Sequence, residues 1–293
     1  MRELISVIIP FYYGNEYILR ALESVEKVSC AIEKKADVEV IIVNDSPEIE
    51  VIYPDIKLDC RVIINEKNCG IHKSRVNGLK HAKGQYIQFL DQDDELLVDG
   101  YGAQLENMKS ADVSVGNGFY SMKEKKYRIY KSYASMEYLI QLERLLKIRN
   151  LIPSPGECLI KKAAIPMVWI NNNLSVDGAD DWMLWISMFK QGSGFALNPL
   201  MVYRHNDANG ANCSANLDKM RESALEANSI LHQHGTITAL EAEKWGNAIE
   251  FKYYQDTKRL KVLDCIRFRR EIFDNIRYKF TMYMKNCSKT LME

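Results

Sequence analysis

Strand–helix alternation over the first 95 residues constrains the fold of this chain more than any other feature of its sequence. Apolar runs typical of β-strands cover residues 4–10, 38–43, 61–64 and 85–90. Helical periodicity follows the first run and returns over residues 71–82. Nearly continuous apolar strands are buried on both faces of a sheet, and their alternation with helices favours parallel, doubly wound order. We therefore expect an α/β fold with a Rossmann-like, mostly parallel sheet flanked by helices.

A cluster of carboxylates follows the fourth apolar run. Asp91, Asp93 and Asp94 come directly after the strand expected to end at Leu90. Carboxylates this close repel one another, and hard oxygen ligands of this kind suit Mg²⁺ or Mn²⁺. The carboxyl end of a strand in an open α/β sheet is also where ligands bind. The alternative is a solvated acidic turn, which is common after strands.

Further candidate residues follow the first two strands. Tyr12 comes just after Pro10, which we expect to end the first strand, and Asp45 follows the second strand. Since these strand ends converge on one edge of the sheet, a planar base could stack on Tyr12 and donate N–H groups to Asp45. No glycine-rich dinucleotide or P-loop motif accompanies them. Taken singly, Tyr12 is equally a half-exposed core aromatic, and Asp45 a helix N-cap or Asx-turn.

A second group of carboxylates stands before an apolar helix. Asp180 and Asp181 precede Trp182 and a run rich in Leu, Ile, Met and Phe. Either they complement the N-terminus of that helix, or one of them is a general base beside an apolar ring. His205 ends a strand expected over residues 200–205 and is either a metal ligand or a polar loop residue. Residues 206–216, rich in Asn, Ala and Gly, are a candidate lid.

Fewer signals mark the other elements. We expect a strand at residues 113–115, a hairpin within 119–131 and one amphipathic helix over 135–148 with Ser135 as its N-cap. Residues 217–284 look helical throughout. The segment 258–285 is basic and amphipathic, so it either contacts an anionic membrane surface or packs on the protein with a solvated basic face.

Composition excludes several classes of protein. Lys and Arg total 39, as do Asp and Glu, so charge gives no argument for nucleic-acid binding. The seven cysteines are scattered without a C-x-x-C pair, which argues against a zinc site or a disulfide framework and favours a reducing compartment. No signal peptide is recognisable, and no apolar stretch approaches the roughly 20 residues of a membrane span. We expect a cytoplasmic protein that is peripheral at the inner membrane face if the basic segment binds lipid.

Together these motifs resemble those of family-2 inverting glycosyltransferases, which have the GT-A fold. The first four motifs lie in the family's order and spacing, and the fifth is weaker. The chain departs from the family pattern at Tyr13 and Val76, where Asn is usual, and at Asp180, where Glu is usual. The matching motifs are residues 6–12, 43–45, 68–78, 84–94 and 180–185.

The resemblance implies a role for each matching residue. Tyr12 and Asp45 would hold the uracil or other base, Asp91 the ribose and metal side, and Asp93 would be the main metal ligand. Asp181 would be the catalytic base. The remaining implied contacts are Pro10, Gly70 and Arg75 with the nucleotide, His205 with the metal, and Asp180 and Trp182 with the acceptor.

The implied protein is a metal-dependent transferase that uses Mn²⁺ or Mg²⁺ and a nucleotide sugar such as UDP-hexose or UDP-N-acetylhexosamine. Its acceptor would be a glycan or lipid-linked oligosaccharide of a bacterial surface polysaccharide. Residues 1–214 would form the catalytic domain, with a nucleotide-sugar half at 1–110 and an acceptor half at 111–214, and residues 215–293 a helical C-terminal extension. A catalytically inactive binding or scaffold subunit is the alternative. A nucleotidyltransferase is disfavoured because the loop after the first strand is not glycine-rich and basic.

Overall fold

The computed structural model describes residues 2–53, 56–122, 125–206 and 216–287. By its internal contacts the chain divides into two compact units. The first unit comprises Met1–Ile129, Ser154–Ile165 and Ser193–Asn212, and the second comprises Tyr130–Pro153, Pro166–Gly192 and Cys213–Glu293. The chain therefore leaves the first unit and returns to it twice. The expected functional boundary at residue 214 stays a prediction.

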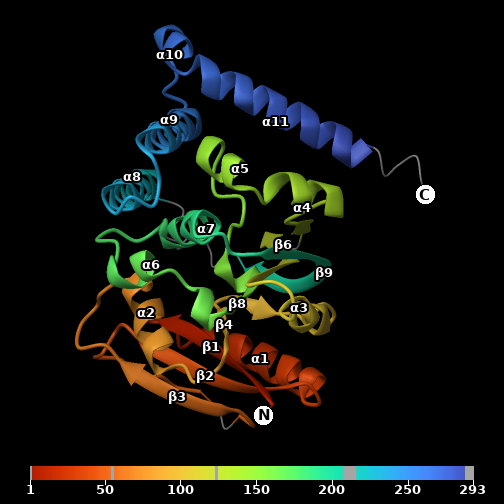
Figure 1. Cartoon of the computed structure of the whole chain (residues 1–293). Helices are drawn as coiled ribbons and strands as arrows, with labels where there is room; N and C mark the ends of the chain where they lie inside the picture. The colour runs from red at the N-terminus through yellow and green to blue at the C-terminus, as the bar shows by residue number, and fades with distance from the viewer. Residues whose placement is uncertain (1, 54–55, 123–124, 207–215, 288–293) are drawn as a thin grey trace. The chain divides into compact units, whose positions relative to one another are not determined.

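A single sheet dominates the first unit (Figure 1). Its strands lie in the order β3-β2-β1-β4-β8-β6-β9-β5, with β7 paired to β6 beside this path. Parallel ladders join β1 to β2 and β4, β2 to β3, and β6 to β9, and the other pairs are antiparallel. The strands are β1 (Glu3–Phe11), β2 (Ala36–Asn44), β3 (Asp59–Ile64), β4 (Tyr86–Phe89), β5 (Glu95–Leu96), β6 (Val113–Met122), β7 (Lys125–Arg128), β8 (Cys158–Lys161) and β9 (Phe195–Asn206).

Helices cover both faces of the parallel half of this sheet, which confirms the predicted α/β fold. On β1, Ile5, Val7 and Ile9 pack into one buried cluster with the apolar side of α1. Ile8 points to the opposite face, where a Cβ on Gly78 of α2 would lie only 2.3 Å from its Cγ2. Glycine therefore lets α2 approach the sheet closely. The helical segments of this unit are α1 (Ile18–Ile32), α2 (Ile71–His81), α3 (Tyr101–Asn107), η1 (Pro155–Glu157) and η2 (Lys162–Ala164).

Two strand boundaries differ from the sequence prediction. Pro10 lies inside β1, which continues to Phe11, because β4 no longer flanks β1 there and the missing N–H costs no ladder bond. The strand expected at residues 113–115 runs on as β6 because it pairs along most of its length with β9. Gly116 and Gly118 made this strand hard to predict, because glycine is uncommon in strands. Both are needed here, since a side chain at either position would collide with β9. The expected hairpin is confirmed by the β6–β7 pairing, and its residues 123–124 lie outside the described part.

Helices make up the second unit. Its core contains Trp182, Trp185 and Trp245, all buried, and the rings of Trp182 and Trp245 pack edge-to-face with centroids 5.3 Å apart. The helices are α4 (Tyr133–Leu139), α5 (Leu142–Lys147), α6 (Met167–Asn171), α7 (Asp180–Lys190), α8 (Leu217–Gln233), α9 (Ala239–Asp256), α10 (Val262–Arg267) and α11 (Arg269–Cys287). The expected helical character after residue 217 is thus confirmed. Of the helices described, none has the length and apolarity needed to cross a membrane.

The single helix expected over residues 135–148 is wrong. The segment forms α4 and α5, separated by extended backbone at Gln141. Ile140 and Leu145 are both buried, although in one straight helix their side chains would point about 140° apart. The N-cap is Ser132 rather than Ser135, which instead completes a capping box: each hydroxyl accepts the other residue's backbone N–H. Of the candidate lid, residues 207–215 lie outside the described part.

Candidate active site

Asp45, at the carboxyl end of β2, is buried and organises the loop that follows β3. Its Oδ1 accepts hydrogen bonds from Asn65 Nδ2 at 2.7 Å and from the Cys69 backbone N–H at 2.9 Å. Its Oδ2 accepts the Gly70 backbone N–H at 2.9 Å. The Cys69 thiol also donates to Oδ1, and burial together with this bond raises the pKa of the thiol to about 11. Asp45 is therefore a fixed carboxylate whose Oδ2 has capacity for a second donor.

Gly70 stands where this loop turns into α2. Its φ of 85° lies in the left-handed region, which glycine adopts without the cost that a Cβ would impose. Four residues further on, Ser74 Oγ accepts a hydrogen bond from Asn65 Nδ2 at 3.0 Å. The loop is thus held between Asp45 and the first turn of α2. The expected base-binding residue and this glycine lie side by side.

The loop after β1 is bound to the loop after β4 through one side chain. Gln92 accepts the Tyr12 backbone N–H at 2.9 Å through Oε1 and donates Nε2 to the Tyr12 carbonyl at 3.0 Å. A Cβ on Gly14 would lie 2.0 Å from Gln92 Oε1, so glycine leaves room for the amide. The Tyr12 side chain is 50% exposed and meets the Tyr13 ring edge-to-face. Tyr12 therefore presents ring surface next to the aspartate-rich turn.

Arg75 and Asp91 form an ion pair at the same edge. Arg75 Nη2 lies 2.5 Å from Asp91 Oδ1, and the Arg75 side chain is almost fully buried. A buried guanidinium is stable only with such a partner. The pair brings α2 and the turn after β4 together, and the nucleotide contacts that the resemblance implies for both residues stay predictions.

Asp94 is completely buried and fixes the end of β9. Tyr203 donates its hydroxyl to Asp94 Oδ2, and the Asn206 backbone N–H reaches Oδ1 at 2.9 Å. His205 Nδ1 lies 3.2 Å from Asp94 Oδ1. Burial lowers the pKa of His205, but its hydrogen bond to Asp94 and the neighbouring carboxylates outweigh this and raise it to about 9. Because Asp94 engages Nδ1, Nε2 is the ring nitrogen able to meet a ligand.

Asp93 is the carboxylate of this cluster whose ionised form is opposed both by burial and by neighbouring negative charges. Burial first, and then the charges of Asp94 and Asp91, raise its pKa to about 7. A cation beside Asp93 would relieve both effects. In the described residues, no three His, Cys, Asp or Glu side chains converge as a complete metal cage. Mg²⁺ with a phosphate ligand commonly takes only one or two carboxylates from the protein, and Asp93 with Asp91 offers that hard oxygen set.

The second group of expected residues lies in the second unit, at the start of α7. Asp181 Oδ2 accepts Asn150 Nδ2 at 2.8 Å, and its Oδ1 accepts the Trp182 backbone N–H at 2.7 Å. Asp180 is buried, and its carbonyl accepts Trp169 Nε1 at 2.8 Å. Asp181 itself is half-buried. Both carboxylates lie in the first helical turn, where the helix dipole stabilises negative charge.

Indole hydrogen bonds hold the segment that carries Asn150 against α7. Trp182 Nε1 donates to the Leu145 carbonyl and Trp185 Nε1 to the Ile152 carbonyl, each at 3.1 Å. These bonds flank Asn150 in sequence and fix its amide beside Asp181. Trp182 is 8% exposed, so the structure gives it a packing role, and the acceptor contact expected for Asp180 and Trp182 stays a prediction.

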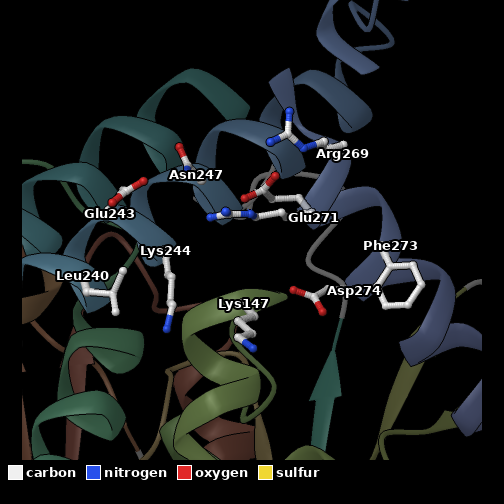
Figure 2. Close-up of a pocket in the computed structure, with 10 residues that line it drawn as sticks. Lys147, Leu240, Glu243, Lys244, Asn247, Arg269, Glu271, Phe273 and Asp274 are labelled. Carbon is white, nitrogen blue, oxygen red and sulfur yellow. The ribbon is translucent and has the colours of Figure 1, made fainter. Parts of the chain in front are cut away.

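A cavity of about 400 Å³ lies elsewhere in the second unit, among α5, α9 and α11 (Figure 2). Lys147, Lys244, Glu271 and Asp274 are among the side chains that line it. It contains none of the residues predicted from the sequence. Its lining mixes both signs of charge, so it does not favour one class of ligand.

Sequence reasoning missed several residues of the site. Asn65 directly follows the third strand, so the strand-end rule that found Asp45 could have found it too. Gln92 lies between two predicted aspartates, but its bridge to Tyr12 depends on the distance between two loops. Asn150 meets Asp181 across 31 positions of sequence, and no local signal points to it.

Comparison with known proteins agrees with this geometry. A family model described as "Glycosyl transferase family 2" matches residues 6–167, more than half of the chain. Glycosyltransferase GlyG of Streptococcus pneumoniae serotype 4 is 28% identical over 158 residues, which are 51% of this chain and 50% of GlyG. The match to the uncharacterized glycosyltransferase EpsJ of Bacillus subtilis, 32% identical, covers 41% of this chain and 35% of EpsJ. This chain therefore spans half or less of these two relatives.

Two further proteins match over more of their length. WfgD of Escherichia coli, named as a UDP-Glc:alpha-D-GlcNAc-diphosphoundecaprenol beta-1,3-glucosyltransferase, is 25% identical over 67% of this chain and 73% of its own. The crystal structure of S. aureus TarS 1-349 in complex with UDP-GlcNAc superimposes with a TM-score of 0.59 at 16% identity, and covers 94% of this chain and 80% of that chain. The TarS likeness shows a shared GT-A-like fold. With its strand-end motifs inside the matched region, the chain belongs to glycosyl transferase family 2.

Proposed function

We propose that this chain transfers a sugar from a nucleotide diphosphate sugar, with a UDP-hexose or UDP-N-acetylhexosamine as donor, to a hydroxyl group of a glycan or lipid-linked oligosaccharide. The observation that carries the proposal is the gathering of Asp45, the Arg75–Asp91 pair and Asp93 at the carboxyl ends of neighbouring strands. The UDP-Glc in the name of WfgD and the UDP-GlcNAc bound to TarS support a uridine nucleotide. We place the reaction in cell-surface polysaccharide synthesis.

The nucleoside would bind between the loops after β1 and β2. Uracil stacks on the exposed Tyr12 ring and donates its N3–H to Asp45 Oδ2, the carboxylate oxygen that already accepts Gly70. Pro10 and Gly70 supply backbone beside the nucleoside. Asp91 accepts from the ribose while Arg75 holds its other side. The carboxylates of Asp45 and Asp91 are already oriented by hydrogen bonds and by an ion pair within the protein.

Asp93, Asp91 and His205 would hold a divalent ion, Mn²⁺ or Mg²⁺. When bound, this ion supplies Lewis-acid stabilisation of the negative charge that builds on the leaving diphosphate. The raised pKa of Asp93 fits this assignment, because a divalent ion beside this carboxylate would offset the burial and the neighbouring negative charges that raise it. Asp94 keeps His205 oriented through Nδ1.

Asp181 would be the general base. It takes the proton from the acceptor hydroxyl as that oxygen attacks the anomeric carbon on the face opposite the diphosphate, so one displacement inverts the configuration. Asn150 donates to Oδ2 and the Trp182 N–H to Oδ1, which orients the carboxylate without protonating it. The helix N-terminus stabilises its ionised form. No covalent carboxylate intermediate is needed.

An inactive binding or scaffold subunit is the alternative to this enzyme. It predicts donor binding without turnover. The retained Asp91, Asp93 and Asp181 favour catalysis, since a subunit that only binds has no use for an oriented base.

Donor hydrolysis distinguishes the two functions. A panel of UDP- and dTDP-sugars is incubated with the protein in Mn²⁺, Mg²⁺ or EDTA, and free sugar and bound nucleotide are measured. We expect one donor to bind and release sugar slowly only when metal is present. Binding without release, even with acceptor glycans added, would favour the scaffold. The absence of binding with either ion would refute the nucleotide site.

A further inference from the structure

An exposed apolar stripe runs along α11, the last described helix. We call it the α11 stripe: it consists of large side chains that are each more than half exposed, namely Phe273, Ile276, Phe280, Tyr283 and Met284. Their spacing of three, four, three and one residues keeps them on one side of a helix. Phe273 and Phe280, seven residues apart, are 64% and 65% exposed. Contiguous apolar surface of this kind marks an interaction site on a water-soluble protein.

The basic side chains of α11 are more exposed than its acidic ones. Arg269, Arg270, Arg277 and Lys279 are all exposed. The acids are less exposed: Glu271 is 9% exposed and Asp274 is half-buried. Both line the cavity of Figure 2, as do the more exposed Arg269, Arg270 and Phe273. At 100° per residue, Arg270 and Arg277 fall within about 60° of Phe273, and Lys279 borders the stripe on the other side. The exposed side of α11 thus combines aromatic and aliphatic groups with positive charge and no described acid.

We propose that α11 is a membrane-docking helix that lies flat on a bilayer rich in anionic lipid, with the α11 stripe at the boundary between headgroups and acyl chains. Basic residues flanking an apolar face are attracted to anionic headgroups, and each adds to binding near the surface. Arginine and lysine reach outward from such a helix while their stems cover apolar surface. The partner is therefore a lipid surface, which goes beyond the transfer reaction and does not depend on the sugar transferred.

A second copy of this chain is the competing occupant of the stripe. In a symmetric pair, the same arginines and lysine would line both sides of the contact. No described acid on the exposed side of α11 could pair with them, so like charges would face one another across the interface. An anionic bilayer offers the complementary charge along the whole helix. Charge complementarity therefore selects lipid over self-association.

Vesicle flotation tests the proposal with the full chain. Vesicles of phosphatidylglycerol and phosphatidylcholine in equal amounts are compared with vesicles of phosphatidylcholine alone, at low and high salt. We expect binding to the anionic vesicles, weakened by salt. The double variant Phe273→Ser/Phe280→Ser should bind at least tenfold more weakly. The control Ile52→Ser/Ile64→Ser removes two residues that are 68% and 63% exposed in the first unit, and it should bind as the parent does.

Charge and depth are tested separately. Arg270→Gln/Arg277→Gln should lose binding to anionic vesicles, whereas Lys125→Gln/Lys126→Gln, on exposed strand β7, should not. Phe280→Trp should be quenched by brominated acyl chains if the stripe enters the bilayer. Circular dichroism checks that each variant is folded.

Three results would overturn the proposal. The first is no binding to anionic vesicles by the folded parent chain. The second is equal binding to neutral vesicles that the arginine variant does not change. The third is a concentration-dependent dimer, seen by sedimentation, that Phe273→Ser/Phe280→Ser abolishes; this would make the stripe an interface between copies.

Discussion

Replacing Tyr203 by Phe isolates the hydrogen bond that fixes the end of β9. Tyr203 and Asp94 are both 0% exposed, and the hydroxyl donates to Asp94 Oδ2. The substitution removes one oxygen, keeps the ring that packs near Gly156, and leaves His205 and Asn206 as the remaining partners of the carboxylate. A hydrogen bond to a buried charged group contributes about 1.5–3 kcal/mol, and its loss leaves the carboxylate undersatisfied. We therefore expect the free energy of unfolding to fall by about that amount.

Thermal unfolding followed by circular dichroism in EDTA measures this loss. At about 2–4 °C per kcal/mol for a domain of this size, the midpoint should fall by about 3–12 °C. The control is Tyr253→Phe, whose hydroxyl donates to Asp218 at 2.5 Å and accepts from Arg259 in an exposed setting, where solvent screening leaves such bonds with little effect on stability. A second readout is the affinity for UDP with Mn²⁺. This affinity should weaken because Asp94, which orients His205 through Nδ1, is no longer held by the Tyr203 hydroxyl. Equal, small shifts for both variants would refute the claim that Asp94 is the anchor of this edge.

Three other outcomes are expected. Asp45→Asn should reduce UDP affinity at least tenfold in calorimetry, and an unchanged affinity would remove Asp45 from the base site. Gly78→Ala should destabilise the chain by about 1–3 kcal/mol in urea because its Cβ would meet β1, whereas Gly102→Ala on α3, whose Cβ would meet nothing closer than 3.8 Å, should be neutral or stabilising. Burial and neighbouring carboxylates raise the pKa of Asp93 to about 7, and carboxylate contacts that outweigh burial raise that of His205 to about 9, so both groups hold protons more tightly in the folded chain. The free energy of unfolding without metal should therefore fall as the pH rises from 5.5 to 9. Loss of the Asp93 proton causes the fall up to about pH 7, and loss of the His205 proton causes it above about pH 6.5. A thermal midpoint in EDTA that is flat or rises with pH would contradict these shifts.

The parallel half of the sheet could be predicted because its strands are buried on both faces. Such strands have continuous apolar sequences. The polar residues that directly follow them lie at one edge of the sheet, because the carboxyl ends of parallel strands meet there. Asp45 and Asp93 could therefore be predicted as candidate site residues from their places at the strand ends. The same rule would have reached Asn65.

The rest depends on contacts between distant parts of the chain. The register Leu96↔Tyr203 between β5 and β9 brings Tyr203 to the aspartate-rich turn, and no local pattern encodes it. The break between α4 and α5 contains no Gly or Pro that would mark it in the sequence. The helix is interrupted there because Ile140 is buried, which depends on contacts with distant residues. Asn150 reaches Asp181 only because tryptophans of α7 hold its segment in place.

Paired titrations of two aspartate variants test the central claim most directly. UDP-sugar binding and sugar release are measured with Mn²⁺ and with EDTA for the parent chain, Asp93→Ala and Asp181→Asn. We predict that Asp93→Ala loses the metal-dependent part of donor affinity, while Asp181→Asn binds donor as the parent does and no longer transfers sugar to an acceptor. Undiminished transfer by Asp181→Asn, or metal-dependent binding that survives in Asp93→Ala, would contradict the account.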